Sequence, residues 1–210
     1  MVIPAPLYAA GLLVLAAGAL GLRRLRGHDH RIGIALLLTL AVACDMVGER
    51  TLRDELAATR VARLVSGRDD VSVRCIGWFN LDRLVHSSAE GWVQFDADGR
   101  AADVATVDAG QCRTFHHFVS TGKVDQKTVV AVEVVIHESV HLSGVTDEAE
   151  TMCRGLAATP KVVQALGKDP KVGLRIVNTY LHVTYGYMPE EYQRPDRCAA
   201  ELTAAGVVPG

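Results

Sequence analysis

The chain of 210 residues lacks an excess of either charge, since 22 lysines and arginines stand against 24 aspartates and glutamates and the formal net charge is −2. Electrostatic attraction to nucleic acid or to an acidic polymer requires a strongly basic surface. Nucleic acid is therefore not an expected partner. The sequence also lacks internal repeats, low-complexity tracts, a glycine-rich phosphate loop and a Ser/His/Asp series. Neither a repeat architecture nor these nucleotide-binding or nucleophilic sites are indicated.

Cysteine is scarce and never occurs as a C-x-x-C pair, which argues against a structural zinc cluster. Apart from Cys44, which lies in an apolar segment, the cysteines are Cys75, Cys112, Cys153 and Cys198. An even number spread over one domain fits two disulfides and an oxidising compartment. Three pairings are possible and the sequence does not choose among them. The working hypothesis pairs Cys75 with Cys112 and Cys153 with Cys198.

The N-terminal region, residues 1–48, has the pattern of a membrane anchor. Residues 2–22 contain no charge, and about 21 apolar residues can cross a hydrocarbon core of about 30 Å. A basic loop follows at 23–31, and a second apolar segment lies at 32–48. Because basic loops stay cytoplasmic, we expect two membrane crossings and a domain outside the cytoplasm at the cell membrane. Alternatively, the second segment is a signal peptide cleaved before Cys44, which exports the domain equally.

Two regions follow the anchor. Residues 49–70 carry charges of both signs with Leu52, Leu56, Thr59 and Arg63 along one side, and we expect a solvated helical stalk. Residues 71–210 are expected to form one domain. Short alternating runs at 71–75, 91–95 and 104–107 predict strands, with a hairpin turn at 96–99.

The most informative motif is His137-Glu138-Ser139-Val140-His141, an H-E-x-x-H pentapeptide. The apolar segment that precedes this motif begins at Thr128 and is rich in β-branched residues, which also suit a strand. The length of the segment favours a helix over residues 128–142. Gly144 stands where a left-handed helix C-cap is expected. Residues four apart share one face of a helix, so both imidazoles can bind one metal ion with Glu138 beside its open position.

A catalytic zinc ion takes three protein ligands and one water, so a third ligand is required. Asp147 and Glu148 are the nearest candidates. At this point the sequence resembles the zincin metallopeptidases. One branch, the metzincins, would use Asp147 after Gly144, and another, the gluzincins, would use Glu148 on a second helix. The spacing of Asp147 and Glu150 suits an N-cap and its partner, which favours Glu148 and leaves Asp147 as the alternative.

The stretch from His137 to Cys153, together with residues 188–192 and Cys198, is also similar to a group of uncharacterised membrane-anchored bacterial H-E-x-x-H proteins. These resemblances imply an α+β zincin-like domain with a small sheet, an active-site helix and a helix hairpin. They imply Zn²⁺ on His137, His141 and Glu148, with Glu138 as the base that hydrolyses a peptide or protein substrate. The alternative is a catalytically inactive zincin-like protein that binds a partner or has a structural role in the cell envelope.

Other features of the last part of the chain are less specific. Thr159-Pro160 is expected to end the second helix of the hairpin, and 172–183 to form another helix. His116 and His117 are adjacent and point apart, so they cannot readily share an ion. A tyrosine could stabilise the transition state, but the sequence does not choose among Tyr180, Tyr185, Tyr187 and Tyr192. It also gives no oligomeric state and no substrate specificity.

Overall fold

The computed structural model describes residues 50–77, 89–193 and 195–207, and for residues 195–198 the backbone alone. The expected membrane segments at 2–22 and 32–48 lie outside these ranges. Within the described ranges, every helix is too short or too polar to cross a membrane. Residues Thr51–Gly210 form one compact unit.

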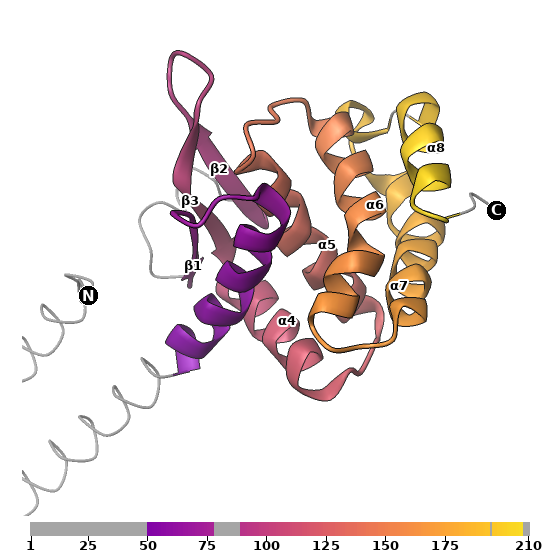
Figure 1. The fold of residues 1–210 in the computed structure, drawn as a ribbon, viewed down its shortest axis with the longest axis horizontal. Coiled ribbons are helices and arrows are strands. Elements are labelled where there is room, and N and C mark those ends of the chain that lie inside the picture. The colour runs from indigo at the N-terminus through magenta and orange to yellow at the C-terminus, as the bar shows by residue number, and fades with distance from the viewer. Residues whose placement is uncertain (1–49, 78–88, 194, 208–210) are drawn as a thin grey trace, which may run out of the picture. The chain divides into compact units, whose positions relative to one another are not determined.

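The described chain is an α+β domain, as the sequence predicts (Figure 1). A helix at residues 50–66 precedes a small sheet, and helices follow the sheet. The elements are β1 (Ser72–Ile76), β2 (Gly91–Phe95), β3 (Ala101–Asp108), α4 (Ala109–Thr121), α5 (Gln126–His141), α6 (Glu148–Ala165), α7 (Pro170–Val183) and α8 (Pro195–Ala204), with short 3₁₀ turns η1 (Tyr185–Tyr187) and η2 (Glu190–Tyr192) between α7 and α8.

The sheet has three described strands in the order β1-β3-β2, so β2 lies at an edge. β1 runs parallel to β3, and β2 runs antiparallel to it. The predicted hairpin turn joins β2 to β3. Its Asp96 carboxylate accepts hydrogen bonds from the amides of Asp98 and Arg100, at 2.9 and 2.8 Å. Asparaginyl and aspartyl side chains favour turns for this reason.

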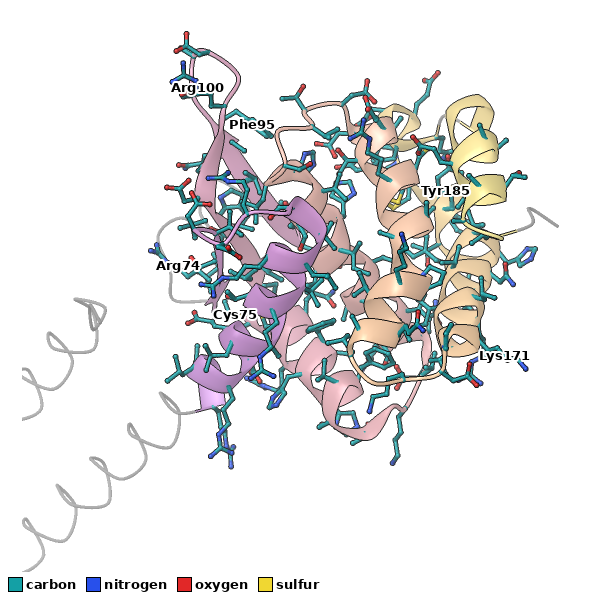
Figure 2. The ribbon with its side chains drawn as sticks, viewed as in Figure 1. Arg74, Cys75, Phe95, Arg100, Lys171 and Tyr185 are labelled. Carbon is teal, nitrogen blue, oxygen red and sulfur yellow. A yellow bond between two sulfur atoms is a disulfide. The ribbon has the colours of Figure 1, made fainter. Side chains whose placement is uncertain are left out.

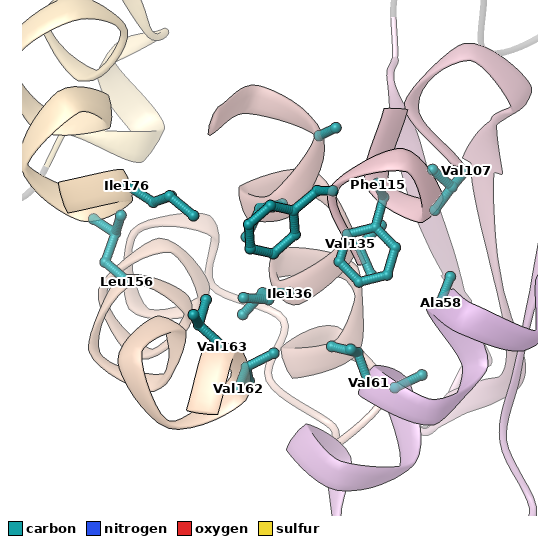
Figure 3. Packing of buried hydrophobic residues seen from close by; sticks show 14 of the residues in the cluster. Ala58, Val61, Val107, Phe115, Val135, Ile136, Leu156, Val162, Val163 and Ile176 are labelled. Carbon is teal, nitrogen blue, oxygen red and sulfur yellow. The ribbon is translucent and has the colours of Figure 1, made fainter. Parts of the chain in front are cut away.

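Helix α5 is the central element, because it contacts β2, β3, α4, α6 and α7. This position explains its continuous apolar sequence: a helix surrounded by other elements has no polar face. Figure 3 shows Val135 and Ile136 of α5 between Phe115 of α4 and Leu156 of α6. All four side chains are fully buried. A central helix packed on several sides gives the H-E-x-x-H motif at its C-terminal end a rigid support.

The helix at residues 50–66 is not the solvated stalk that its charges suggested. Its Ala58, Val61 and Ala62 side chains are buried in the core, and Thr59 accepts the amide of Val73 at 2.9 Å. Leu52 and Leu56 do not pack into the core, since they are about half exposed, at 48% and 52%. The contacting stripe consists of small residues, which allow close packing and carry a weak hydrophobic signal in the sequence.

Helix α6 does not end at Pro160 as predicted, but continues through it to Ala165. Proline removes one intrahelical hydrogen bond and usually breaks a helix. Here Thr159 Oγ1 donates a hydrogen bond to the carbonyl of Gly155 at 2.9 Å in the turn before the proline, and α7 packs closely against the proline. A Cβ on Gly173 would lie 2.6 Å from Pro160 Cα, so this contact requires a glycine. Tertiary packing therefore maintains the helix.

The predicted disulfide between Cys75 and Cys112 is present and joins β1 to α4. Figure 2 shows Cys75 near the helix of residues 50–66, whose Glu55 accepts the amide of Cys75 at 2.9 Å. Cys153 is also disulfide-bonded. The side chain of Cys198, its partner in the working hypothesis, lies outside the described part, so that pairing stays a prediction.

Candidate metal centre

The H-E-x-x-H motif forms the C-terminal end of α5, and the chain then reverses into α6. Gly144 has the positive φ of 96° expected for the turn. Asp147 is the N-cap of α6 and accepts the amide of Glu150 at 2.8 Å. This confirms the capping role that the spacing predicts. Glu148 is the first residue of α6 and therefore faces back toward α5. Arg68 holds the end of α5 from outside, donating to the carbonyl of Leu142 at 3.1 Å.

The structure brings His137, His141 and Glu148 together. His137 Nε2 lies 2.9 Å from Glu148 Oε2, His141 Nε2 lies 3.3 Å from the same oxygen, and the two Nε2 atoms are 3.1 Å apart. Two ligands of a tetrahedral zinc ion, each about 2.0–2.1 Å from it, are about 3.3 Å apart. The spacing therefore fits one ion with small adjustments. Asp147, the alternative ligand, is used as a helix cap.

The protonation pattern of the cluster also favours a cation. His141 Nδ1 lies 2.7 Å from the carbonyl of Val145, which can only accept a hydrogen bond. This contact places a proton on Nδ1, so in the neutral ring the lone pair is on Nε2. That lone pair, the Glu148 oxygen and His137 Nε2 converge on one point. Convergent lone pairs repel unless a proton or a metal ion lies among them.

The electrostatic effects on the three ligands differ. Burial is the largest effect on the pKa of His137 and lowers it. Burial also opposes the charged form of His141, but hydrogen bonds to Glu148 and to the carbonyl of Val145 raise its pKa overall. For Glu148, burial opposes ionisation, yet hydrogen bonds from both histidines hold its pKa well below the usual range. An ionised carboxylate beside a mostly neutral imidazole is the form that binds a divalent metal.

Glu138 is buried beside these ligands, with a relative exposure of 6%. Its Oε2 has no hydrogen-bond partner within the described ranges. Burial raises its pKa to about 8, His141 lowers it and Glu148 raises it further. A buried carboxyl group without a partner is costly and is usually retained for function. This is the environment of a proton acceptor.

Gly91 on β2 makes room for Glu138. A Cβ built at Gly91 would lie 2.7 Å from Glu138 Cγ and 2.8 Å from its Oε1. Only glycine therefore allows the edge strand to approach the carboxyl group this closely. The contact places β2 directly beside the centre. Its last residue, Phe95, makes an edge contact with the ring of His141 at a centroid distance of 5.9 Å.

A cavity of about 400 Å³ adjoins the centre. It extends from His137 and Glu138 along α5 to Glu133, one helical turn earlier. Its other walls come from the start of β2, from α6 and α7, and from the segment after α7. They include Gly91, Val130, Met152, Tyr180, Met188 and Tyr192.

Tyr192, one of the four candidate tyrosines, lies beside the candidate ligands. The centroids of its ring and of the His137 ring are 5.8 Å apart. Burial and the charges of Glu148 and Glu138 raise its pKa to about 12, so the hydroxyl stays a donor. Tyr180 also lines the cavity, and burial with the charges of Glu133 and Glu90 raises its pKa.

Sequence reasoning did not single out Gly91, Glu133 or Tyr192. Glu133 left a usable signal, because it is the only charged residue in the apolar run of α5 and stands four residues before His137. The sequence around Gly91 contains no comparable signal, since the role of this residue depends on a contact between distant segments. His116 lies away from the centre as expected and pairs with Asp54 at 2.7 Å.

Comparison of the chain with protein-family models, with curated proteins and with solved structures gives no match. What the centre does is therefore inferred from its own geometry. The structure supports the coarse prediction of an α+β domain with a small sheet, and it groups the three predicted ligands.

Proposed function

We propose that this protein is a zinc-dependent metallopeptidase with a zincin-like arrangement. The observation that carries the proposal is the combination of three convergent ligand atoms with an unpartnered buried carboxyl group beside them. His137, His141 and Glu148 would hold the ion. When bound, zinc supplies an activated water with a pKa near 7 and polarises the carbonyl group of the substrate.

The residues of the chain supply the remaining steps. Glu138 takes a proton from the attacking water and delivers it to the leaving amine, as its buried position on the H-E-x-x-H motif allows. Tyr192 is a hydroxyl donor next to the ligands and can stabilise the developing oxyanion. His141 is kept in place by the carbonyl of Val145.

The edge strand provides a place for the substrate. Among the described strands, β2 pairs with β3 alone, so its other edge can accept an extended peptide through main-chain hydrogen bonds. The contact between Gly91 and Glu138 ties this strand to the catalytic carboxyl group. A peptide on β2 would therefore pass beside the centre.

The proposed location is outside the cytoplasm, anchored by the N-terminal region. The disulfide between Cys75 and Cys112 supports this location, because disulfides persist mainly in oxidising compartments.

The test measures zinc and peptide cleavage in the full chain. We expect about one zinc ion per chain in the wild type, its loss in His141→Ala, and its retention in an inactive Glu138→Gln variant. His182→Ala, an exposed histidine on α7, is the matched control and should change neither quantity. A folded wild type that binds no zinc would refute the proposal.

The alternative is a catalytically inactive zincin-like protein, and the position of Tyr192 is the observation that favours it. Its ring centroid lies 5.8 Å from that of His137, so its hydroxyl group could take the remaining position of a bound metal ion. In that case Tyr192→Phe would keep zinc and create activity in an otherwise inactive protein. In a peptidase the same change lowers kcat by about 10-fold or more.

A further inference from the structure

The cavity beside the metal centre is acidic in composition. Three carboxylic residues, Glu90, Glu133 and Glu138, line it, and neither lysine nor arginine is among its described lining residues. Its walls otherwise consist mostly of apolar side chains, such as Val130, Val134 and Met152. A narrow apolar space with acidic groups suits a ligand that has an aliphatic stem and a positive end.

Glu133 marks the part of the cavity away from the metal ligands. It is 2% exposed, and Thr159 Oγ1 lies 2.9 Å from its Oε1. The same hydroxyl group lies 2.9 Å from the carbonyl of Gly155. A threonine hydroxyl has a single proton, so it serves only one of these acceptors at a time. Thr159 therefore satisfies at most one acceptor site of the Glu133 carboxyl group.

Glu133 also has no cationic partner among the described residues. Burial raises its pKa to about 8, the hydrogen bond with Thr159 lowers it, and no cationic side chain contributes within the described residues. A buried acid is normally paired, because an unpaired one destabilises the fold. Glu90, the second acid, has its hydrogen bond from Gln111 Nε2 at 2.9 Å.

We propose that this cavity binds the positively charged side chain of a substrate residue, lysine or arginine, next to the scissile peptide bond, with Glu133 as its counter-ion. The inference rests on the proposed peptidase function and adds a substrate class to it. A cation that approaches Glu133 favours the ionised carboxylate, which then pairs with it.

The spacing along α5 favours a side chain over the α-amino group of the substrate. Glu133 and His137 are separated by one turn of the helix, a rise of about 6 Å. This rise is about the length of an extended lysine side chain. An α-amino group next to the scissile bond would remain near the ligands and would not reach Glu133.

The test uses N-acetylated quenched fluorescent peptides that differ at one residue flanking the scissile bond: lysine, arginine, norleucine or glutamate. With the full wild-type chain we expect kcat/KM to be at least about 10-fold higher for lysine or arginine than for norleucine. Glu133→Gln keeps the size of the side chain and an acceptor for Thr159, and should abolish the preference. Glu150→Gln, which removes an acid on α6 outside the cavity lining, is the matched control.

Binding separates this inference from the peptidase proposal. Fluorescence anisotropy of labelled lysine and norleucine peptides on the chelator-treated full chain needs no catalysis. Tighter binding of the lysine peptide, lost in Glu133→Gln, supports the cavity assignment even if no peptide is cleaved. Equal binding of the two peptides overturns it even if both are cleaved. A preference seen only with free N-termini would assign Glu133 to the α-amino group and would also overturn the side-chain assignment.

Discussion

The two sides of α5 differ in how their polar groups are satisfied. On the side of the helix at residues 50–66, Asp54 pairs with His116, Glu55 and Thr59 accept strand amides, and Cys75 is bonded to Cys112. On the side of α6, His137 Nδ1 and Glu138 Oε2 are buried with no partner in the described part.

Under the proposed function, this contrast separates a side of α5 that serves stability from a side that serves chemistry. Buried polar groups are nearly always paired, so two orphan atoms on adjacent residues require a reason. These two lie beside three converging candidate ligand atoms and a cavity, whereas the third orphan atom of the described part, Glu201 Oε2, belongs to α8. If this division is correct, changes on the first side should alter stability and leave metal binding intact, and changes on the second side should alter metal binding or activity.

The largest expected effect is on the stabilising side. The paired substitution Cys75→Ser and Cys112→Ser removes a crosslink between residues separated by 37 positions. Loop-closure entropy predicts a loss of about 4 kcal/mol in the free energy of unfolding. Urea denaturation of the chelator-treated protein measures this loss. Zinc content of the folded fraction should stay at the wild-type value, and its loss from folded protein would break the division.

Glu133 lies between the two sides and gives a pH test. Its pKa is raised from 4.5 to about 8, so between these values the folded state holds a proton that the unfolded state has lost. Stability from this group is fully present below about pH 4.5 and is lost as pH rises toward 8, at up to about 1.4 kcal/mol per pH unit. In Glu133→Gln this slope disappears.

Urea denaturation at pH 5, 6 and 7 with a chelator present measures the difference between wild type and variant. Glutamine does not titrate. Between pH 5 and pH 7 we therefore expect the free energy of unfolding of the variant to rise relative to that of the wild type by up to about 3 kcal/mol. Parallel curves would show that Glu133 is ionised in the folded protein.

Gly91→Ala tests the chemical side without touching a ligand. The new Cβ would lie 2.7 Å from Glu138 Cγ, so the carboxyl group must move. A displacement of about 1 Å in a reacting group can cost about 100-fold in rate, and we expect kcat/KM to fall by about 10-fold to 100-fold at unchanged zinc content. Gly77→Ala is the control, because its Cβ meets no atom within 4 Å. Equal activities of the two variants would remove Gly91 from the site.

The smallest effect compares two helix caps. Asp147→Ala removes the cap of α6, and Asp125→Ala removes that of α5, whose side chain accepts the amide of Thr128 at 2.8 Å. Each should cost about 1 kcal/mol of stability. Only Asp147→Ala should also weaken zinc binding, by a few fold, because Glu148 begins the helix that Asp147 caps. Competition with a chromogenic chelator measures the zinc affinity of each variant. Equal zinc affinities of the two variants would show that the cap of α6 does not influence the metal centre.

Local patterns predicted much of this arrangement. The length of the apolar run indicated helix α5, and the spacing of Asp147 and Glu150 indicated the start of α6 and left Glu148 for the metal centre. Both inferences need only residues that are close in sequence. The position of β2 was predicted from alternation for the same reason.

The failures involve contacts between distant segments. Pro160 was expected to end a helix, and the packing of Gly173 against it overrides that local preference. The alanine stripe of residues 57–62 was read as part of a stalk because small residues give a weak pattern. The roles of Gly91 and Glu133 depend on their contacts in the folded structure, and a single sequence does not show these contacts.

All three ligands of the centre come from a single short stretch, since His137 and Glu148 are 11 positions apart. The carboxyl group that would act on a substrate depends in addition on β2, more than 40 residues earlier in the sequence. If the proposed function is correct, metal binding and catalysis can therefore be lost separately in descendants of this chain. A sequence that keeps the helix hairpin intact but replaces Gly91 would still bind the ion and would have lost the means to use it.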